Sequence, residues 1–319
     1  MKIDKIKTKK LLWLHIEKPT RSEIEYLKTE YDFHPLDLED CLVKVQRPQI
    51  SEYAHYVFFI LTFPAYNREN REIESGEIDF FIGSKYLITI SDGRIPTLKN
   101  LFNELKTNEY SRDKYMMNSH PVFLLYEMLH RLQNHAMPML DHITQEIEDI
   151  EKRIFKGDEK KLVIEILHTK RNIVDFRRIM QAHKNIIKKL MNTHDKFFMH
   201  DKINIYFTNI LDRSKDIWEI LETLRENINT FQETNESLIS HRLNDIMKTL
   251  TIVSVVLIPA NLIASIFGMN AQHMPFIGTP YDFYILVTII FIMVFFFMLY
   301  FVKRNGSNPQ KSPLSGGLS

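Results

Sequence analysis

The sequence predicts an α+β membrane protein with an N-terminal cytosolic α/β domain, a long α-helical stalk and two C-terminal transmembrane helices. Three observations predict this architecture. In residues 1–110, β-branched and aromatic runs alternate with helix signals. Residues 158–258 contain neither Gly nor Pro, the two residues that interrupt helices most strongly. Residues 249–281 and 283–302 contain no Asp, Glu, Lys or Arg.

Composition narrows the class of protein. The 319 residues carry a formal net charge of +1, which gives no reason to expect nucleic acid as a partner. The single cysteine, Cys41, excludes an intrachain disulfide and is typical of a reducing compartment. No pattern of a nucleophile with its base is found, so we predict that the protein is not an enzyme.

The first 110 residues are expected to form the cytosolic α/β domain. Four apolar runs bounded by Pro, Gly, Asn or Asp predict strands at residues 11–16, 56–63, 78–82 and 86–90, and residues 83–85 would close a hairpin between the last two. Thr20 and Glu23 form a capping box that begins a helix extending to about residue 31. Two further short helices are predicted at residues 36–43 and 97–105.

Helical spacing of apolar residues continues from this domain towards the C-terminus. We predict three long helices with breaks near residues 156–159 and 193–201, and we assign residues 111–200 to long cytosolic helices. Nothing stops the third helix between residue 201 and Pro259. About 65 helical residues extend on the order of 100 Å, which is longer than one globular domain. Residues 201–248 are therefore expected to form a stalk that runs into the membrane and needs partner helices.

Two segments are long enough to cross a bilayer, for which a helix needs about 20 apolar residues. A pair of buried core helices is the alternative, and it is disfavoured because residues 285–300 are apolar on every face. We place the transmembrane helices at residues 249–267 and 284–302, with a loop at residues 268–283 and a basic, disordered tail at residues 303–319.

The charges that flank the spans predict the topology. Arg242 and Lys248 precede the first span and Lys303 and Arg304 follow the second, whereas the loop between the spans has no Lys or Arg. By the positive-inside rule, the loop is external and both termini are cytoplasmic, in a multi-pass protein of the cell membrane.

One face of the first span is a candidate pore lining. Two spans per chain cannot enclose a channel, so a pore requires several copies around an axis. An amide facing lipid at the depth of Asn261 would be costly, and packing of that amide against a neighbouring helix is the alternative to pore lining, which we favour. The uncharged residues that share this face at steps of three or four are Asn244, Met247, Leu250, Ser254, Ile258 and Asn261.

Three segments resemble the CorA-type magnesium transporters. Gly268-Met269-Asn270 lies where the first span exits, as the signature of that family does, and residues 34–40 and 46–53 are similar to the family's N-terminal domain. The resemblance implies a funnel-shaped homopentamer whose first span lines the pore, with the Gly-Met-Asn string as the selectivity filter at the outer mouth. Carbonyl and amide oxygens there could bind Mg²⁺ through the water molecules that it retains. Met269 is expected to pack rather than to ligate, because its thioether is soft.

The resemblance also implies a function. We expect passive, membrane-potential-driven uptake of Mg²⁺, with Co²⁺ and Ni²⁺ as further substrates, gated by cytosolic metal. Mg²⁺ would be both substrate and regulatory ligand, and no other cofactor is expected. Two alternatives remain open, which are a Zn²⁺ transporter of the same superfamily and a non-conducting, membrane-anchored sensor or scaffold.

This sequence departs from the family pattern in the external loop and at the positions expected to bind regulatory Mg²⁺. In the family a Met-Pro pair follows the signature, as Met274-Pro275 does here, and the position after it is often acidic. That position is Phe276 in this chain, so Asp282 is the one acidic residue of the loop. Family members close when cytosolic Mg²⁺ binds acidic residues between subunits, and the matching positions are amides here. For each candidate a solvated polar group is the simpler interpretation; the candidates are Asn67 and Asn209, their neighbours Glu69 and Asp212, and Glu233 farther along the stalk.

Overall fold

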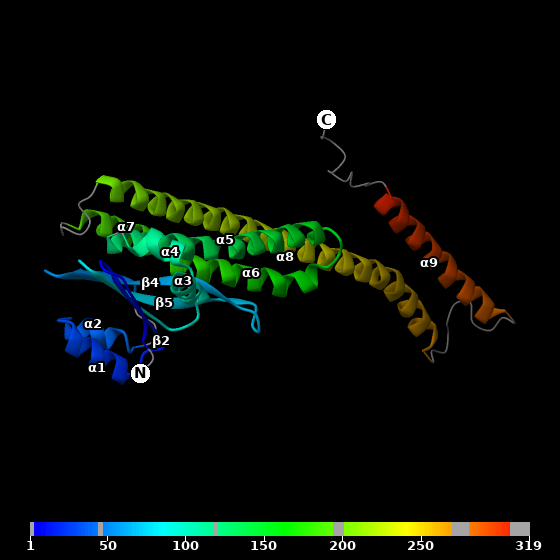
Figure 1. The fold of residues 1–319 in the computed structure, drawn as a ribbon. Coiled ribbons are helices and arrows are strands. Elements are labelled where there is room, and N and C mark those ends of the chain that lie inside the picture. Colours follow the sequence, from blue (N-terminus) through cyan, green and yellow to red (C-terminus); the bar gives the residue numbers. More distant parts are fainter. Residues whose placement is uncertain (1–2, 44–46, 118–119, 194–200, 270–280, 307–319) are drawn as a thin grey trace, which may run out of the picture. The chain divides into compact units, whose positions relative to one another are not determined.

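The computed structural model describes residues 3–43, 47–117, 120–193, 201–269 and 281–306. It divides into two compact units, Met1–Asn235 and Glu236–Ser319, each of which is considered by itself. The N-terminal unit contains one sheet and the helices packed on its two faces (Figure 1). The C-terminal unit contains two long helical segments.

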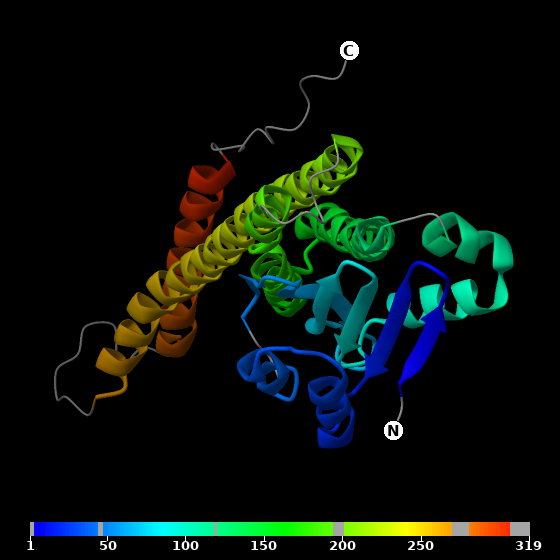
Figure 2. The same cartoon turned by 60° about the vertical axis from the view of Figure 1, so that its left-hand side comes forward.

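The sheet of the N-terminal unit has six strands in the order β1-β2-β6-β5-β4-β3. β2 and β6 run parallel, with Leu12 opposite Tyr86, and the other neighbouring pairs are antiparallel. Figure 2 shows the sheet from a second side. The strands are β1 (Asp4–Lys7), β2 (Leu12–Glu17), β3 (Gln49–Glu52), β4 (Tyr56–Asn67), β5 (Glu72–Gly83) and β6 (Tyr86–Ser91).

All four predicted strands are present, as is the predicted hairpin between β5 and β6. β1 and β3 were not predicted. Each has only four residues, and each carries charged or polar side chains because it lies at an edge of the sheet. Such short edge strands have little hydrophobic pattern of their own and form because a longer strand offers its free edge.

Helices from different parts of the chain cover the two faces of the sheet. α1 (Arg21–Glu30) and α2 (Pro35–Asp40) contribute Ile24, Leu27 and Leu38 to a core on one face. α3 (Pro96–Thr107) and α5 (Pro121–Ile154) bury their apolar stripes on the other face. Between α3 and α5 lie the short α4 (Glu109–Arg112) and a single π-helical turn, η1 (Asp113–Met117).

The predicted capping box is confirmed at the start of α1. The Thr20 backbone N–H donates to a Glu23 carboxylate oxygen at 3.0 Å, and the Thr20 side chain in return accepts hydrogen bonds from the first turn of the helix. The box satisfies donors that the first turn leaves without intrahelical partners.

The helical region after α5 differs from the prediction in one respect. One helix was expected between the breaks near residues 156–159 and 193–201, but the chain forms α6 (Glu159–Met180) and then α7 (His183–Asn192). At the junction His183 is buried, its ring nitrogen Nε2–H donates to the carbonyl oxygen of Thr62 at 2.6 Å, and its ring meets Phe63 edge-on. This contact with β4 redirects the chain without any Gly or Pro, so the sequence had no local signal for it.

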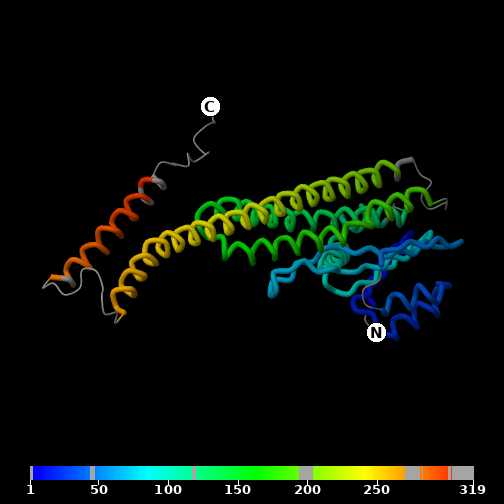
Figure 3. The backbone as a smooth tube through the Cα atoms, turned by 180° about the vertical axis from the view of Figure 1, so that it is seen from behind, coloured from blue at the N-terminus to red at the C-terminus, as the bar shows by residue number. Residues whose placement is uncertain are grey.

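α8 (Asp201–Phe267) begins in the N-terminal unit, where it packs against α5 and α6. The buried Gln133 amide of α5 donates to the Ser214 hydroxyl at 2.7 Å, and Arg177 of α6 pairs with Glu222 at 2.5 Å. Near the end of this unit Asn235 donates its side-chain amide to the carbonyl of Glu159 at 3.1 Å. The backbone of α8 is one continuous helix, as the tube in Figure 3 shows.

The C-terminal unit holds the remainder of α8 and α9 (Asp282–Gly306). Asn204–Phe267 and Phe283–Tyr300 are each long and apolar enough to cross a membrane, and both expected apolar helices are therefore present. Their large side chains are exposed in the single chain, for example Leu262 at 59% and Phe291 at 72%. Apolar surface on this scale is stable only when lipid or further protein covers it.

Candidate functional site

The predicted pore-lining residues lie on one face of α8. Three or four residues separate successive members, so they share about a third of the helix circumference. In the single chain Ser254 is half-buried and the other members of the stripe are exposed. The structure thus brings Asn244, Met247, Leu250, Ser254, Ile258 and Asn261 together as one continuous uncharged stripe.

The Gly-Met-Asn string begins where α8 ends. The Gly268 N–H donates to the carbonyl of Ala264 at 3.0 Å, and the Met269 N–H donates to the carbonyl of Ile266 at 3.2 Å. A Cβ added at Gly268 would lie 3.2 Å from the Ala264 carbonyl oxygen, so glycine here permits a close backbone approach. The Met269 side chain is 65% exposed. Asn270 and the loop residue Phe276 lie outside the described residues.

A proline interrupts the hydrogen-bond ladder of α8 within the apolar segment. Pro259 has no N–H, so it cannot bond the carbonyl oxygen of Val255 one turn earlier. It lies beside Ile258 of the stripe and two residues before Asn261. The backbone of the candidate pore helix is therefore locally weakened at the depth where its polar amide lies.

The candidate regulatory residue Asn67 holds the turn between β4 and β5. Its side-chain oxygen accepts the backbone N–H groups of Glu69 at 3.0 Å and Asn70 at 3.4 Å. Its side-chain nitrogen donates to the carboxylate of Glu74 at 2.6 Å. The sequence did not single out Glu74, because only the hairpin places it against Asn67.

α6 anchors this turn. The buried side chain of Asn172 accepts the N–H of Ile73 at 3.0 Å and donates to the carbonyl of Arg71 at 2.9 Å, which replaces the backbone partners that the turn lacks. Arg71 also pairs with Glu146 of α5 at 3.4 Å. The position of the hairpin is thus determined by helices about a hundred residues later in the chain.

The other candidate regulatory residues lie along α8, apart from the hairpin. Asn209, Asp212 and Glu233 are exposed, and Asp212 pairs with Lys215 one turn later at 2.6 Å. Among the described residues no contact joins them to Asn67 or Glu69, and no three His, Cys, Asp or Glu side chains are grouped closely enough to hold a metal ion. A regulatory cation site built from these residues would need another copy of the chain.

The two N-terminal motif segments meet through Asp37. This buried carboxyl accepts hydrogen bonds from the hydroxyls of Tyr53 at 3.2 Å and Tyr56 at 3.0 Å. Burial raises the pKa of Asp37, and the two hydroxyl donors oppose that rise. The motif residues around 34–40 and 46–53 therefore contribute to the packing of α2 on the sheet.

Comparison with known proteins places the chain among membrane transporters. The sequence model of the family described as CorA-like Mg²⁺ transporter protein matches residues 8–304. The cobalt/magnesium transport protein CorA of Thermotoga maritima is 23% identical over 293 residues, which cover 92% of this chain and 82% of that protein. The solved CorA magnesium transporter of Methanocaldococcus jannaschii superposes with a TM-score of 0.78 at 20% identity, covering 93% of this chain and 92% of that one. A structure of full-length CmaX gives a TM-score of 0.72 at 18% identity, covering 93% and 89%.

Proposed function

The chain belongs to the family of CorA-like Mg²⁺ transporter proteins, and from that premise we propose that it conducts Mg²⁺ passively through a pore lined by several copies of α8. The observation that carries the proposal is the uncharged stripe on α8, which leads to Gly268 and whose members other than Ser254 are exposed in the single chain. We infer Co²⁺ and Ni²⁺ as further substrates from the name of the Thermotoga relative and the shared chemistry of these small, strongly hydrated ions.

The chemistry of the stripe suits a hydrated divalent ion. Mg²⁺ sheds water reluctantly and is usually bound with several waters retained. Amide and hydroxyl oxygens, as on Asn244, Ser254 and Asn261, can accept hydrogen bonds from those waters, whereas carboxylates would hold the ion too firmly to release it. Gly268, Met269 and Asn270 would form the filter at the external end, with Met269 as a packing residue.

The membrane potential alone supplies enough energy for uptake. Moving a charge of +2 through 100 mV releases about 4.6 kcal/mol. That free energy corresponds to roughly a thousandfold accumulation at equilibrium. The proposed direction is inward across the cytoplasmic membrane, with both termini in the cytosol.

We propose a homo-oligomer, because two spans per chain cannot enclose a pore and the exposed apolar faces of α8 and α9 need covering. The resemblance to the CorA-type transporters implies that this oligomer is a pentamer. Cytosolic Mg²⁺ would close this pore by binding between copies. Asn67 and Glu69 on one copy would face Asn209 and Asp212 on the next, and Glu233 would form a separate ring. Because Asn67 and Asn209 are amides, this closure would be less sensitive to Mg²⁺ than with carboxylates.

Ion flux into liposomes that contain the purified protein tests the proposal. With an inside-negative voltage, wild type should take up Mg²⁺, and Asn270→Ala should lose flux while its oligomer stays intact. Asn227→Ala is the matched control, since it removes an exposed amide from the cytosolic part of the same helix.

The alternatives predict other results. Uptake of Zn²⁺ that Mg²⁺ does not inhibit would assign the protein as a zinc transporter. If the vesicles admit no divalent metal, the remaining assignment is a non-conducting sensor or scaffold.

A further inference from the structure

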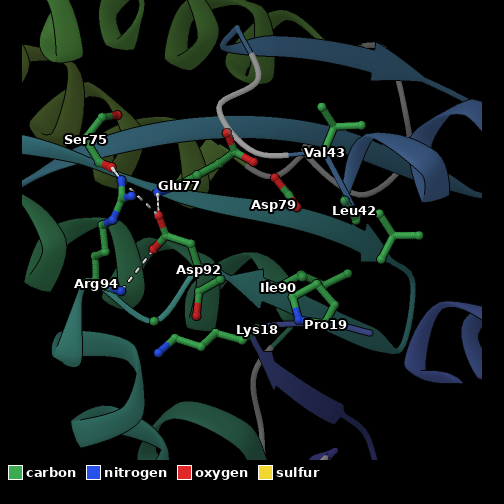
Figure 4. Close-up of a pocket in the computed structure, with 13 residues that line it drawn as sticks. Lys18, Pro19, Leu42, Val43, Ser75, Glu77, Asp79, Ile90, Asp92 and Arg94 are labelled. Carbon is green, nitrogen blue, oxygen red and sulfur yellow. Dashed lines mark hydrogen bonds and ion pairs between the residues drawn. The ribbon is translucent and has the colours of Figure 1, made fainter. Parts of the chain in front are cut away.

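A pocket of about 450 Å³ lies in the N-terminal unit, on the face of the sheet that α1 and α2 cover (Figure 4). Its volume lies within the range of about 300–1,000 Å³ in which proteins bind small molecules. Leu42, Val43 and Ile90 form an apolar part of its wall. The charged and thiol side chains that line it are Lys18, Cys41, Glu77, Asp79, Asp92 and Arg94.

The pocket lies at a switch point of the sheet. β2 and β6 are adjacent and parallel. The helix that follows β2, α1, packs on one face of the sheet, whereas the helix that follows β6, α3, packs on the other. Lys18 and Asp92 directly follow the two strands and line the pocket. The crevice between such diverging connections is where open α/β sheets characteristically bind ligands.

Asp79 provides a second, independent observation. It is 3% exposed, and its Oδ1 atom has no hydrogen-bond partner in the part of the chain that the structure describes. The buried Cys41 thiol donates to the carbonyl of Asp37 at 3.1 Å and also contacts the Asp79 carboxyl. A buried polar atom without a partner is costly, so Oδ1 is a site for a hydrogen bond that the protein itself does not supply.

The acidic groups around this pocket carry no surplus charge. Asp92 lies 3.7 Å from the Arg94 guanidinium, which also donates to the carbonyl of Ser75 at 2.6 Å. Glu77 likewise has a partner within the protein. Burial, and next to it the charge of Glu77, raises the pKa of Asp79 well above its usual value, so this carboxyl keeps its proton at neutral pH. The pocket therefore offers no unpaired carboxylate to a cation.

An anion is not favoured either. Lys18 is exposed and adjoins Glu17, whose pKa is lowered by the hydrogen bond from Lys99 and also by the charge of Lys18. An anion beside Asp79 would in addition meet the negative charge of Glu77. A ligand of either charge would thus bury a charge without a partner, which is costly. These contacts favour a neutral ligand.

We propose that this pocket binds a small neutral molecule whose apolar body lies against Leu42, Val43 and Ile90 and whose amide or hydroxyl group hydrogen-bonds to Oδ1 of Asp79. An amide suits either position of the carboxyl proton. Its N–H can donate to Oδ1, and its carbonyl oxygen can accept when Oδ1 carries the proton. The assignment does not depend on ion conduction, and binding can be measured without it.

Titration calorimetry on the full chain, with three probes of similar shape, tests the charge of the ligand. At pH 7 nicotinamide is neutral, nicotinate is an anion and 3-(aminomethyl)pyridine is a cation. Nicotinamide should bind about tenfold or more tightly than either charged probe, because neither charge would find a partner in the pocket. Equal or tighter binding of a charged probe would overturn the proposal.

Two substitutions at Asp79 test the hydrogen bond. Asp79→Leu removes both carboxyl oxygens and should weaken nicotinamide binding about tenfold or more. Asp79→Asn is the matched control, because an amide is as neutral as the protonated carboxyl and keeps hydrogen-bonding atoms at the same place. Its affinity should change less than about threefold. Equal affinity of wild type and Asp79→Leu, or equal loss in both variants, would contradict the assigned contact.

A further variant keeps the test valid if Asp79→Leu fails to fold. Val43→Trp fills the pocket from a side chain that is 54% exposed, and it leaves the carboxyl group in place. It should abolish nicotinamide binding. Unchanged affinity in Val43→Trp, or no binding heat from wild type at millimolar nicotinamide, would also overturn the proposal.

Discussion

At the scale of single residues, Asn67 has two hydrogen-bonding roles in the β4–β5 hairpin. Its amide oxygen holds the turn of the hairpin, and its amide nitrogen is bonded to Glu74 at 2.6 Å. A carboxylate in its place would keep the first role, since it can accept both backbone N–H groups. It would also face the carboxylate of Glu74, and two such groups repel one another unless a cation lies between them.

We therefore predict that Asn67→Asp increases the sensitivity of closure to cytosolic Mg²⁺. The cation concentration for half-closure should fall several-fold, because a second carboxylate raises the charge of the site. Flux into vesicles at stepped internal Mg²⁺ measures the shift. Asn70→Asp, at an exposed neighbour in the same turn, is the control and should leave the curve in place. An unchanged curve for Asn67→Asp would remove this residue from regulation.

His183 is a buried titratable group at the junction of α6 and α7. Burial lowers its pKa to about 4, and the hydrogen bond to Thr62 only partly opposes the shift. In the unfolded chain the pKa of a histidine is about 6.5, so between these values the unfolded state binds more protons than the folded state. Stability from this residue is fully present above about pH 6.5 and is lost as the pH falls towards 4, by about 3 kcal/mol in total.

His183→Gln is predicted to flatten the acid side of the stability profile. Glutamine can still donate to the Thr62 carbonyl but does not titrate, so the variant should lose less stability than wild type between pH 6.5 and 4. Unfolding followed by tryptophan fluorescence over a pH series measures the difference, with the exposed His55→Gln as control. Parallel profiles for wild type and His183→Gln would contradict the assigned titration.

At the scale of elements, the side chain of Asn172 connects α6 to the β4–β5 hairpin by hydrogen bonds. Asn172→Ala should destabilise the N-terminal unit by about 1–3 kcal/mol, because the N–H of buried Ile73 loses its acceptor. Chemical denaturation measures the loss, and hydrogen exchange at Ile73 should accelerate. Asn185→Ala, which removes an exposed amide from α7, should change stability by less than about 0.5 kcal/mol. Similar losses in both variants would mean that Asn172 does not anchor the hairpin.

Elements with local signals could be predicted from the sequence. The capping box of α1 depends on Thr20 and Glu23, which lie three residues apart, and the apolar runs of β4, β5 and β6 are recognisable by themselves. The division between α6 and α7 could not be predicted, because it depends on a contact between His183 and β4 across more than a hundred residues.

The candidate sites show the same contrast. The stripe on α8 follows from helical periodicity alone, and the structure confirms that its members share one helix. A pocket lined by Lys18, Cys41, Asp79 and Asp92 could not be predicted, because these residues form no motif and come from four separate segments of the chain. The bond from Asn67 to Glu74 likewise requires the register of the hairpin.

At the scale of the whole molecule, the proposed pore exists only in an assembly, and this has a measurable consequence. If one defective filter residue disables a pentamer, vesicles made from equal amounts of wild type and Asn270→Ala should retain about 3% of the wild-type flux, since only one assembly in about thirty is free of the variant. Mixing wild type with Asn227→Ala should preserve full flux. Retention of half the flux would mean that each chain conducts alone.

Pro259 gives the long helix a mechanical property that its length alone would not. A helix of 67 residues with all its backbone hydrogen bonds resists bending along its whole length. Pro259 removes one of these hydrogen bonds within the apolar segment. Bending will concentrate at Pro259, so the helical segment after Pro259 can tilt while the segment before it stays straight. In the proposed pentamer, the narrowest passage would then widen by flexing at the five copies of Pro259, with no sliding of the helices that pack in the N-terminal unit.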